Sequence, residues 1–430
     1  MRNFSTALPS TLLLLLILIV SRPAGAYSLL THEQLIDLTW QSSIAPLLRS
    51  RYPNLTPAEL EEARSYAYAG CVIQDIGYYP FGDPFFSDLT HYVRSGDFVV
   101  HLYRDAKSAN ELAFAIGALS HYIGDNVGHA EATNRAVPVE FPKLAAKYGP
   151  VVSFGEAEHA HIQTEFGFDI NEIGHRRFAP VHYLRHVGLN VPDRQLAAAF
   201  YETYGLSEDF SKARFRRVNV EGFRFAVRSF LPRIAYALTL LHRSRMAADP
   251  MSPELQKLES EIALVATTNN WDQYRKKAGI GTYSLAGIIW ILPKIGPLKM
   301  LAIKGPNAST EEEYVRSVNQ STDALSSTLS RFGRPHQTLP NRDLDTGLPV
   351  RAGGYRLTDD TYAKLLHRVA ADPHDTVPPG LKSDILNYYA DPAAPIHTKK
   401  YPAKWAQVQT DLQILKTMPV SNLPIAPETE

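Results

Sequence analysis

The feature that most constrains this chain is a run of histidine and acidic residues at four-residue spacing between His121 and His129. In an α-helix, residues four apart lie on one face, so His121, Asp125 and His129 would project together. Apolar side chains recur at helical spacing over residues 112–123, which extends the same period toward the N-terminus. The spacing therefore predicts a helix with one apolar face and a polar edge able to bind a metal. Three glycines in this helix suggest that another helix or a ligand approaches it closely.

A second pair of candidate ligands, His161 and Glu165, has the same four-residue relation. Imidazole and carboxylate groups without thiolates suit zinc or manganese in hydrolytic sites. Asp75 and His91 add the same chemistry upstream, and His159 lies close enough to His161 to compete with it as a ligand. The alternative is that these are separate hydrogen-bonded polar pairs that hold no metal.

Helical periodicity recurs along the chain, and no segment shows the alternation typical of a strand. The predicted fold class is all-α, with a multi-helix domain over residues 27–248 and an additional, mostly helical region over residues 249–418. Residues 419–430 are predicted to be a disordered tail. Helices are expected near residues 29–48, after Pro57, after Ser108, and near 221–245, 253–268, 310–332, 359–371 and 403–415. The C-terminal region shows no cluster of candidate ligands.

The first 26 residues are predicted to be a secretory signal peptide. Arg2 precedes a ten-residue apolar run over 11–20, and Ala24 and Ala26 form a small-residue cleavage site. An uncleaved membrane anchor would need about 20 apolar residues. We therefore expect a secreted or periplasmic protein whose mature chain begins at Tyr27.

Composition excludes several other classes of protein. Lys and Arg together number 44, as do Asp and Glu, so there is no net charge to attract nucleic acid over long range. The single cysteine, Cys71, excludes an internal disulfide framework and a cysteine-based zinc site.

Taken together, these residues resemble the zinc-dependent phospholipase C family, whose trinuclear-zinc fold is shared by single-strand-specific nucleases. The resemblance covers roughly residues 27–248. It rests on His121-x3-Asp125, His161-x3-Glu165, and Gly70-Cys-Val-Ile-Gln-Asp75 with His91.

The resemblance implies three zinc ions, one of which uses the amino nitrogen and carbonyl oxygen of the mature first residue. The implied ligands are Asp75, His91, His121 and Asp125 for one zinc, His129, His161 and Glu165 for another, and Tyr27 and His32 for the third, with Asp125 as a bridge. Asp75 is also expected to align or deprotonate the attacking water. Tyr27 stands where the family has Trp, which should be harmless because only backbone atoms bind.

The activity implied is hydrolysis of phospholipids at a membrane surface to diacylglycerol and a phosphorylated head group. The alternatives are a nuclease of the same fold and a non-catalytic zinc-binding surface protein. No stable nucleic acid partner is expected. Choline preference is not implied, because Leu29 and Leu30 stand where choline-selective relatives have an acidic residue.

Two apolar features allow more than one interpretation. Aromatic residues after Asp75 could line a substrate pocket or pack the core, and these are Tyr78, Tyr79, Phe81, Phe85 and Phe86. Residues 279–303 are the most apolar stretch of the mature chain, but Pro293 and Pro297 interrupt it. This segment is either buried between the two halves of the chain or dips into a lipid interface.

Overall fold

The computed structural model describes residues 28–79, 82–210, 220–242, 249–303, 305–331 and 338–422. The predicted signal peptide, Tyr27 and Phe81 lie outside these residues, as do residues 423–430 of the predicted tail. Within the described residues every regular element is a helix, and strand-like pairing is limited to two isolated bridges. The predicted all-α class is confirmed.

In the N-terminal half, the helices expected near residues 29–48, after Pro57 and after Ser108 are observed, together with further helices for which no position was predicted. They are α2 (Leu29–Thr39), α3 (Ala45–Arg51), α4 (Pro57–Gly70), α5 (Pro84–Tyr92), α6 (Ser95–Arg104), α7 (Ala109–Gly128), α8 (Asn134–Glu140), α9 (Pro142–Tyr148), α10 (Phe154–Gly174), α11 (Val181–Val187) and α12 (Asp193–Tyr204). Single π-helical turns extend two of them, η1 (Trp40–Ile44) after α2 and η2 (His129–Thr133) after α7.

The C-terminal half is also helical. Its elements are α13 (Val220–Phe225), η3 (Ala226–Phe230), α14 (Leu231–His242), α15 (Pro253–Thr268), α16 (Trp271–Tyr274), α17 (Ile280–Ile291), η5 (Gly296–Leu301), α18 (Ala308–Arg331), α19 (Arg356–Ala370), α20 (Pro379–Tyr388), η6 (His397–Lys400) and α21 (Pro402–Thr417). Helix α20 was not predicted, because Pro379 marks the first turn of a helix rather than a break.

Side-chain caps explain where the main helices begin. The hydroxyl of Thr56 accepts from the amide of Glu59, whose carboxylate accepts from the amide of Thr56 in return. The hydroxyl of Ser108 accepts from the amide of Glu111 at the start of α7. These contacts satisfy amides that the first turn of a helix leaves without a partner.

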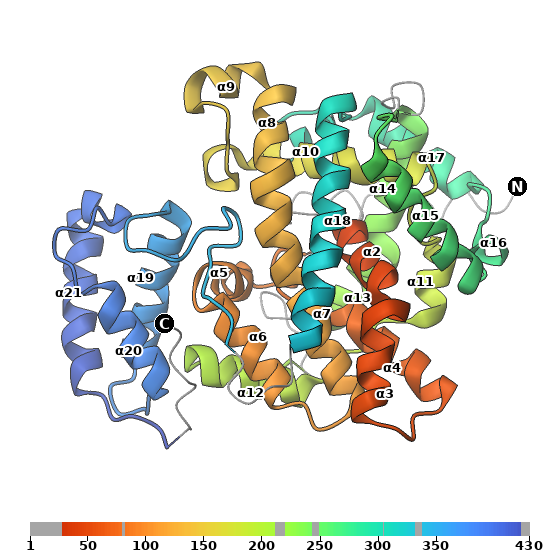
Figure 1. The fold of residues 1–430 in the computed structure, drawn as a ribbon. Coiled ribbons are helices and arrows are strands. Elements are labelled where there is room, and N and C mark those ends of the chain that lie inside the picture. The colour runs from red at the N-terminus through yellow and green to blue at the C-terminus, as the bar shows by residue number, and fades with distance from the viewer. Residues whose placement is uncertain are drawn as a thin grey trace, which may run out of the picture.

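Helix α7 is the central element and packs against α4, α6 and α18 (Figure 1). It crosses α4 at two glycines that permit backbone contact. A Cβ on Gly117 would lie 2.2 Å from the carbonyl oxygen of Ala67, and one on Gly70 would lie 2.0 Å from that of Phe114. The expected close approach of another helix is therefore observed at Gly117.

Helix α18 brings the C-terminal half into the centre of the molecule, where it lies against α7 and α2 (Figure 1). The ring of Tyr314 stacks on Phe168 of α10 with centroids 4.6 Å apart. Its hydroxyl also lies 2.8 Å from that of Thr31. One continuous apolar core includes residues from both halves of the chain.

Helices α19, α20 and α21 lie together on the side of the molecule near α5, opposite α15 and α16 (Figure 1). The chain remains paired beyond α21, because the amide of Val377 donates to Pro419 and the carbonyl of Val377 accepts from Ser421. The tail predicted from residue 419 therefore still makes backbone hydrogen bonds over residues 419–421.

Among the described residues, no helix combines the length and apolar character needed to cross a membrane. The apolar segment 279–303 forms α17 and η5, and α17 packs on α14.

Candidate metal centre

Six described helices or turns place the candidate ligands in the interior. Their histidine and acidic side chains form three buried clusters, and within each cluster one ligand atom per residue lies within 4.8 Å of the others. They are the His32 cluster (His32, His121, Asp125), the His91 cluster (Asp75, His91, His121) and the His161 cluster (His129, His161, Glu165).

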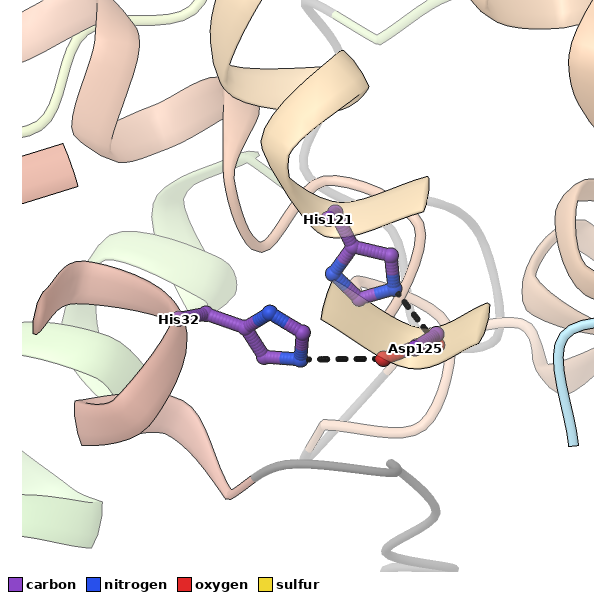
Figure 2. Close-up of side chains that lie close together, drawn as sticks. All are labelled: His32, His121 and Asp125. Atoms are coloured by element: carbon purple, nitrogen blue, oxygen red, sulfur yellow. Dashed lines mark ion pairs between the residues drawn. The ribbon is translucent and has the colours of Figure 1, made fainter. Parts of the chain in front are cut away.

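The His32 cluster joins the first described helix to the end of α7 (Figure 2). The Nε2 atom of His32 lies 3.2 Å from Oδ1 of Asp125, and Nε2 of His121 lies 3.2 Å from Oδ2 of the same residue. The two imidazoles stack with centroids 4.2 Å apart. The two oxygens of Asp125 thus face histidines from different helices.

The His91 cluster shares His121 with the His32 cluster. The Nε2 atom of His91 lies 3.3 Å from Oδ1 of Asp75 and 3.3 Å from Oδ2 of Asp125. It also lies 3.4 Å from Nε2 of His121. The carboxylate of Asp125 therefore belongs to both groups of histidines, which is the arrangement that a bridging ligand requires.

The His161 cluster forms where η2 follows α7. The Nε2 atom of His129 lies 3.8 Å from Oε1 of Glu165, and Nδ1 of His161 lies 2.6 Å from the same oxygen. The Nε2 atom of His161 lies 2.8 Å from the side-chain oxygen of Asn134. His159, the other candidate on α10, is exposed and belongs to none of the three clusters.

Backbone carbonyls fix the tautomer of three of these histidines. The Nδ1 atoms of His91, His121 and His129 lie 2.8, 3.0 and 2.6 Å from the carbonyl oxygens of Ser87, Cys71 and Leu344. A carbonyl can only accept, so each Nδ1 carries a hydrogen and each Nε2 is the ring nitrogen that faces a cluster and can bind a metal there. Zinc-binding histidines are usually held in this way.

The atoms directed into the clusters fit a cation. Oδ1 of Asp75, both carboxylate oxygens of Asp125 and Nε2 of His129 are buried and make no hydrogen bond. Buried polar atoms without partners are costly. Imidazole nitrogens and carboxylate oxygens that converge in this way are the donor set that zinc prefers. The residues present therefore fit zinc.

The pKa shifts of the candidate ligands also fit a bound cation. Burial alone would raise the pKa of Asp125, but the neighbouring imidazoles, His121 first, hold it well below its usual range. Burial opposes a charge on His129, yet Glu165 and Asp345 raise its pKa to about 9. The carboxylates of Glu165 and Asp345 thus favour a positive charge in the His161 cluster.

Residues 338–355 also contribute to the clusters, although no pattern in the sequence predicted this. The carbonyl of Leu344 orients His129, and the amide of Leu344 donates to the carbonyl of His91 at 3.1 Å. The carbonyl of Asp345 accepts from Asn134, and its carboxylate accepts from Tyr92 at 2.9 Å. Backbone donors and acceptors leave no signal in a sequence, so nothing in the residue pattern points to this loop.

The aromatic residues predicted near Asp75 divide between two roles. Phe86 stacks on Phe200 in the core, and Tyr79 stacks on Phe223. Tyr78 instead lines a pocket of about 500 Å³ between α5, α19 and α21.

This pocket adjoins the clusters through three aromatic rings in its lining. Tyr78 and Tyr92 lie 5.5 and 6.0 Å from the ring of His91, and Phe154 lies 5.7 Å from that of His161. Its lining carries charges of both signs, from Arg356, Lys364, Lys404, Asp88, Glu158, Asp360 and Asp411.

Comparison with known proteins agrees with this geometry. Residues 31–208 match the family model described as zinc dependent phospholipase C. No curated protein and no solved structure matches the chain. The matched range contains every residue of the three clusters. The residues of this metal centre therefore lie in a region, residues 31–208, that is similar to the zinc-dependent phospholipase C family.

Proposed function

We propose that the protein is a secreted zinc-dependent phosphodiesterase that hydrolyses phospholipids to diacylglycerol and a phosphorylated head group. The observation that carries this proposal is the presence of three buried clusters within the range that matches the family, two of which share His121. The two oxygens of Asp125 face separate histidines, which supports a centre with more than one metal ion.

Nine residues would hold three zinc ions. They are Asp75, His91, His121 and Asp125 for one ion, His129, His161 and Glu165 for another, and Tyr27 and His32 for the third, with Asp125 shared. Zinc in such a centre supplies Lewis acidity toward a phosphate oxygen and lowers the pKa of water.

Residues of the chain would orient the substrate and accept a hydrogen bond from the attacking water. Oδ1 of Asp75 is buried and has no hydrogen bond, so it can accept one from the attacking water. The pocket beside Tyr78 and Tyr92 would hold the head group, with Lys364 and Lys404 in its lining near the phosphate.

The test is an assay of the purified chain beginning at Tyr27, with its zinc content measured. Phosphatidylcholine, phosphatidylethanolamine and single-stranded DNA are supplied as substrates, each with and without a chelator. Release of diacylglycerol by a protein holding three zinc ions, abolished by the chelator, is the expected result. Cleavage of DNA alone would assign the nuclease, and bound zinc without any turnover would assign a binding protein.

Export is tested separately by mass spectrometry of the protein recovered outside the cytoplasm. A mature N-terminus at Tyr27 is expected, because the proposed amino-nitrogen ligand exists only after cleavage. Recovery of the active protein with residues 1–26 still attached would contradict this part of the proposal.

A further inference from the structure

Helix α17 presents large apolar side chains to solvent. Ile280, Tyr283, Trp290 and Ile291 are 87%, 60%, 72% and 69% exposed, and Ile295 just after the helix is 72% exposed. Residues 280, 283, 290 and 291 fall at helical spacing, so these side chains share one face. Exposed apolar side chains occur singly on most surfaces, whereas a continuous group indicates an interaction site.

The opposite face of α17 fixes the helix to the protein. Ala286 and Ile289 are buried in an apolar cluster with Ile234 and Leu238 of α14. The ammonium of Lys294 donates to the carbonyls of Trp290 and Leu292 at the C-terminal end of α17. The exposed face is therefore held outward by a helix that is packed and capped. Helix α17 lies beside α14, across the molecule from α19–α21 (Figure 1).

A basic pocket of about 410 Å³ begins at the first turn of the same helix, where Gly279 and Thr282 form part of its wall. Among the described residues that line this pocket, none is acidic. Its basic residues are Arg176, His182, Arg185, Arg233, Arg275, Lys276 and Lys277.

These cations have little compensating negative charge. Arg275 faces the carboxylate of Asp272 at 3.5 Å, but that carboxylate is fully exposed. Burial and the repulsion of Arg233 lower the pKa of Arg185, whose Nε donates to a backbone carbonyl rather than to an acid. Burial and Lys276 likewise lower the pKa of His182. An anion in the basic pocket would relieve this repulsion.

We propose that the exposed face of α17 and the basic pocket together form a docking surface for a bilayer that contains anionic phospholipids. The apolar side chains enter the interfacial layer and the pocket holds an anionic head group. Trp and Tyr are enriched at that depth of a bilayer. An apolar helix face flanked by cations is typical of interfacial membrane binding.

The charge of this surface excludes a second copy of the chain as its occupant, because docking two copies face to face would place cations against cations. The docking surface is also distinct from the metal centre and uses none of the candidate ligands. It therefore goes beyond the proposed activity and can be measured without turnover.

The experiment is co-sedimentation of the full chain with vesicles of phosphatidylcholine alone or mixed with phosphatidylglycerol. The wild type should bind the mixed vesicles at least tenfold more tightly than the neutral ones. Replacing two cations near an anionic surface is expected to weaken binding by roughly tenfold or more, so Lys276→Ala with Lys277→Ala should do so. Trp290→Ala with Ile291→Ala should weaken it by a similar factor, and fluorescence of Trp290 should shift to the blue when vesicles are added.

Matched controls replace residues of the same type and exposure elsewhere. Lys143→Ala with Lys147→Ala removes two exposed lysines of α9. Leu348→Ala with Tyr401→Ala removes two exposed apolar side chains, which are 64% and 46% exposed. Both control variants should bind as the wild type does.

The proposal is overturned if the wild type does not bind the mixed vesicles, or if the control variants lose as much binding as the docking-surface variants. A dimer in sedimentation velocity that the Trp290 and Ile291 changes dissolve would also overturn it. Asp125→Asn should abolish turnover and leave vesicle binding intact. Binding without any phospholipase activity would therefore refute the proposed function and support the docking surface.

Discussion

Asp125→Asn is the sharpest perturbation of the metal centre. Its Oδ1 atom lies 3.2 Å from Nε2 of His32, and its Oδ2 atom lies 3.2 and 3.3 Å from Nε2 of His121 and His91. Asparagine keeps the volume of this buried side chain but removes the charge and replaces one oxygen with an amide. Since both oxygens are used, the change should disrupt two clusters together. Zinc content should fall from three ions to one.

The expected loss of stability follows from linkage. A zinc ion present at 100 times its dissociation constant stabilises the folded state by about 2.7 kcal/mol. Loss of two ions should therefore lower the free energy of unfolding by about 5 kcal/mol and the melting temperature by about 10 °C. Glu165→Gln is the matched control, because Glu165 faces only His129 and His161. It should cost one ion and about half as much stability.

The measurements are metal analysis and calorimetry of the two variants, each with and without saturating zinc. The difference between them should disappear after exhaustive chelation if it arises from bound metal. Three ions retained by the Asp125 variant would refute the shared role of this carboxylate. A greater loss of zinc from the Glu165 variant than from the Asp125 variant would refute it equally.

Three further predictions concern other parts of the structure. His161→Ala should lower zinc content by one ion and His159→Ala should leave it unchanged, as metal analysis would reveal, because His159 is exposed outside the clusters. In denaturant unfolding, Gly117→Ala should lower the free energy of unfolding by about 2–4 kcal/mol, because the added methyl group overpacks the crossing with α4. Gly281→Ala is the control, since no heavy atom lies within 4 Å of its Cβ, and it should change the free energy of unfolding by less than about 1 kcal/mol. Burial, with nearby arginines, lowers the pKa of His101 to about 3. Because the unfolded chain binds the proton at higher pH than the folded chain, the free energy of unfolding should fall by a few kcal/mol as the pH is lowered from about 6.5 to 3. The His101→Gln variant should lack this part of the acid sensitivity.

Short-range patterns in the sequence predicted the helices well. The expected helix over residues 253–268 has the bounds of α15, and the cap at Thr56 starts α4 as expected. The four-residue spacing also placed His121 and Asp125 on one face of α7, because helical geometry alone determines that relation. The same spacing pairs His161 with Glu165 on α10, whereas His159, which the sequence left as a competitor, is exposed.

Long-range contacts were much harder to predict. The C-terminal half showed no candidate ligands, yet α18 packs on α7 and the carbonyl of Leu344 orients His129. A carbonyl is present at every residue, so only the path of the chain decides which one lies beside an imidazole. The exposed face of α17 was equally ambiguous, because the same apolar run could have been buried.

Gly347→Ala tests whether the loop over residues 338–355 sustains the metal centre. Gly347 has φ +69°, where a side chain is strained, and its Cβ would lie 2.7 Å from the carbonyl oxygen of Asn126. The loop must therefore move away from α7, and the carbonyl of Leu344 would then leave Nδ1 of His129, now 2.6 Å away. Loss of such an outer contact typically weakens metal binding about 10–100-fold, so the His161 cluster should lose affinity for zinc. Gly354→Ala is the control in the same loop, because its Cβ would have no contact closer than 3.1 Å. Unchanged zinc affinity in both variants would show that His129 keeps its orientation without Leu344.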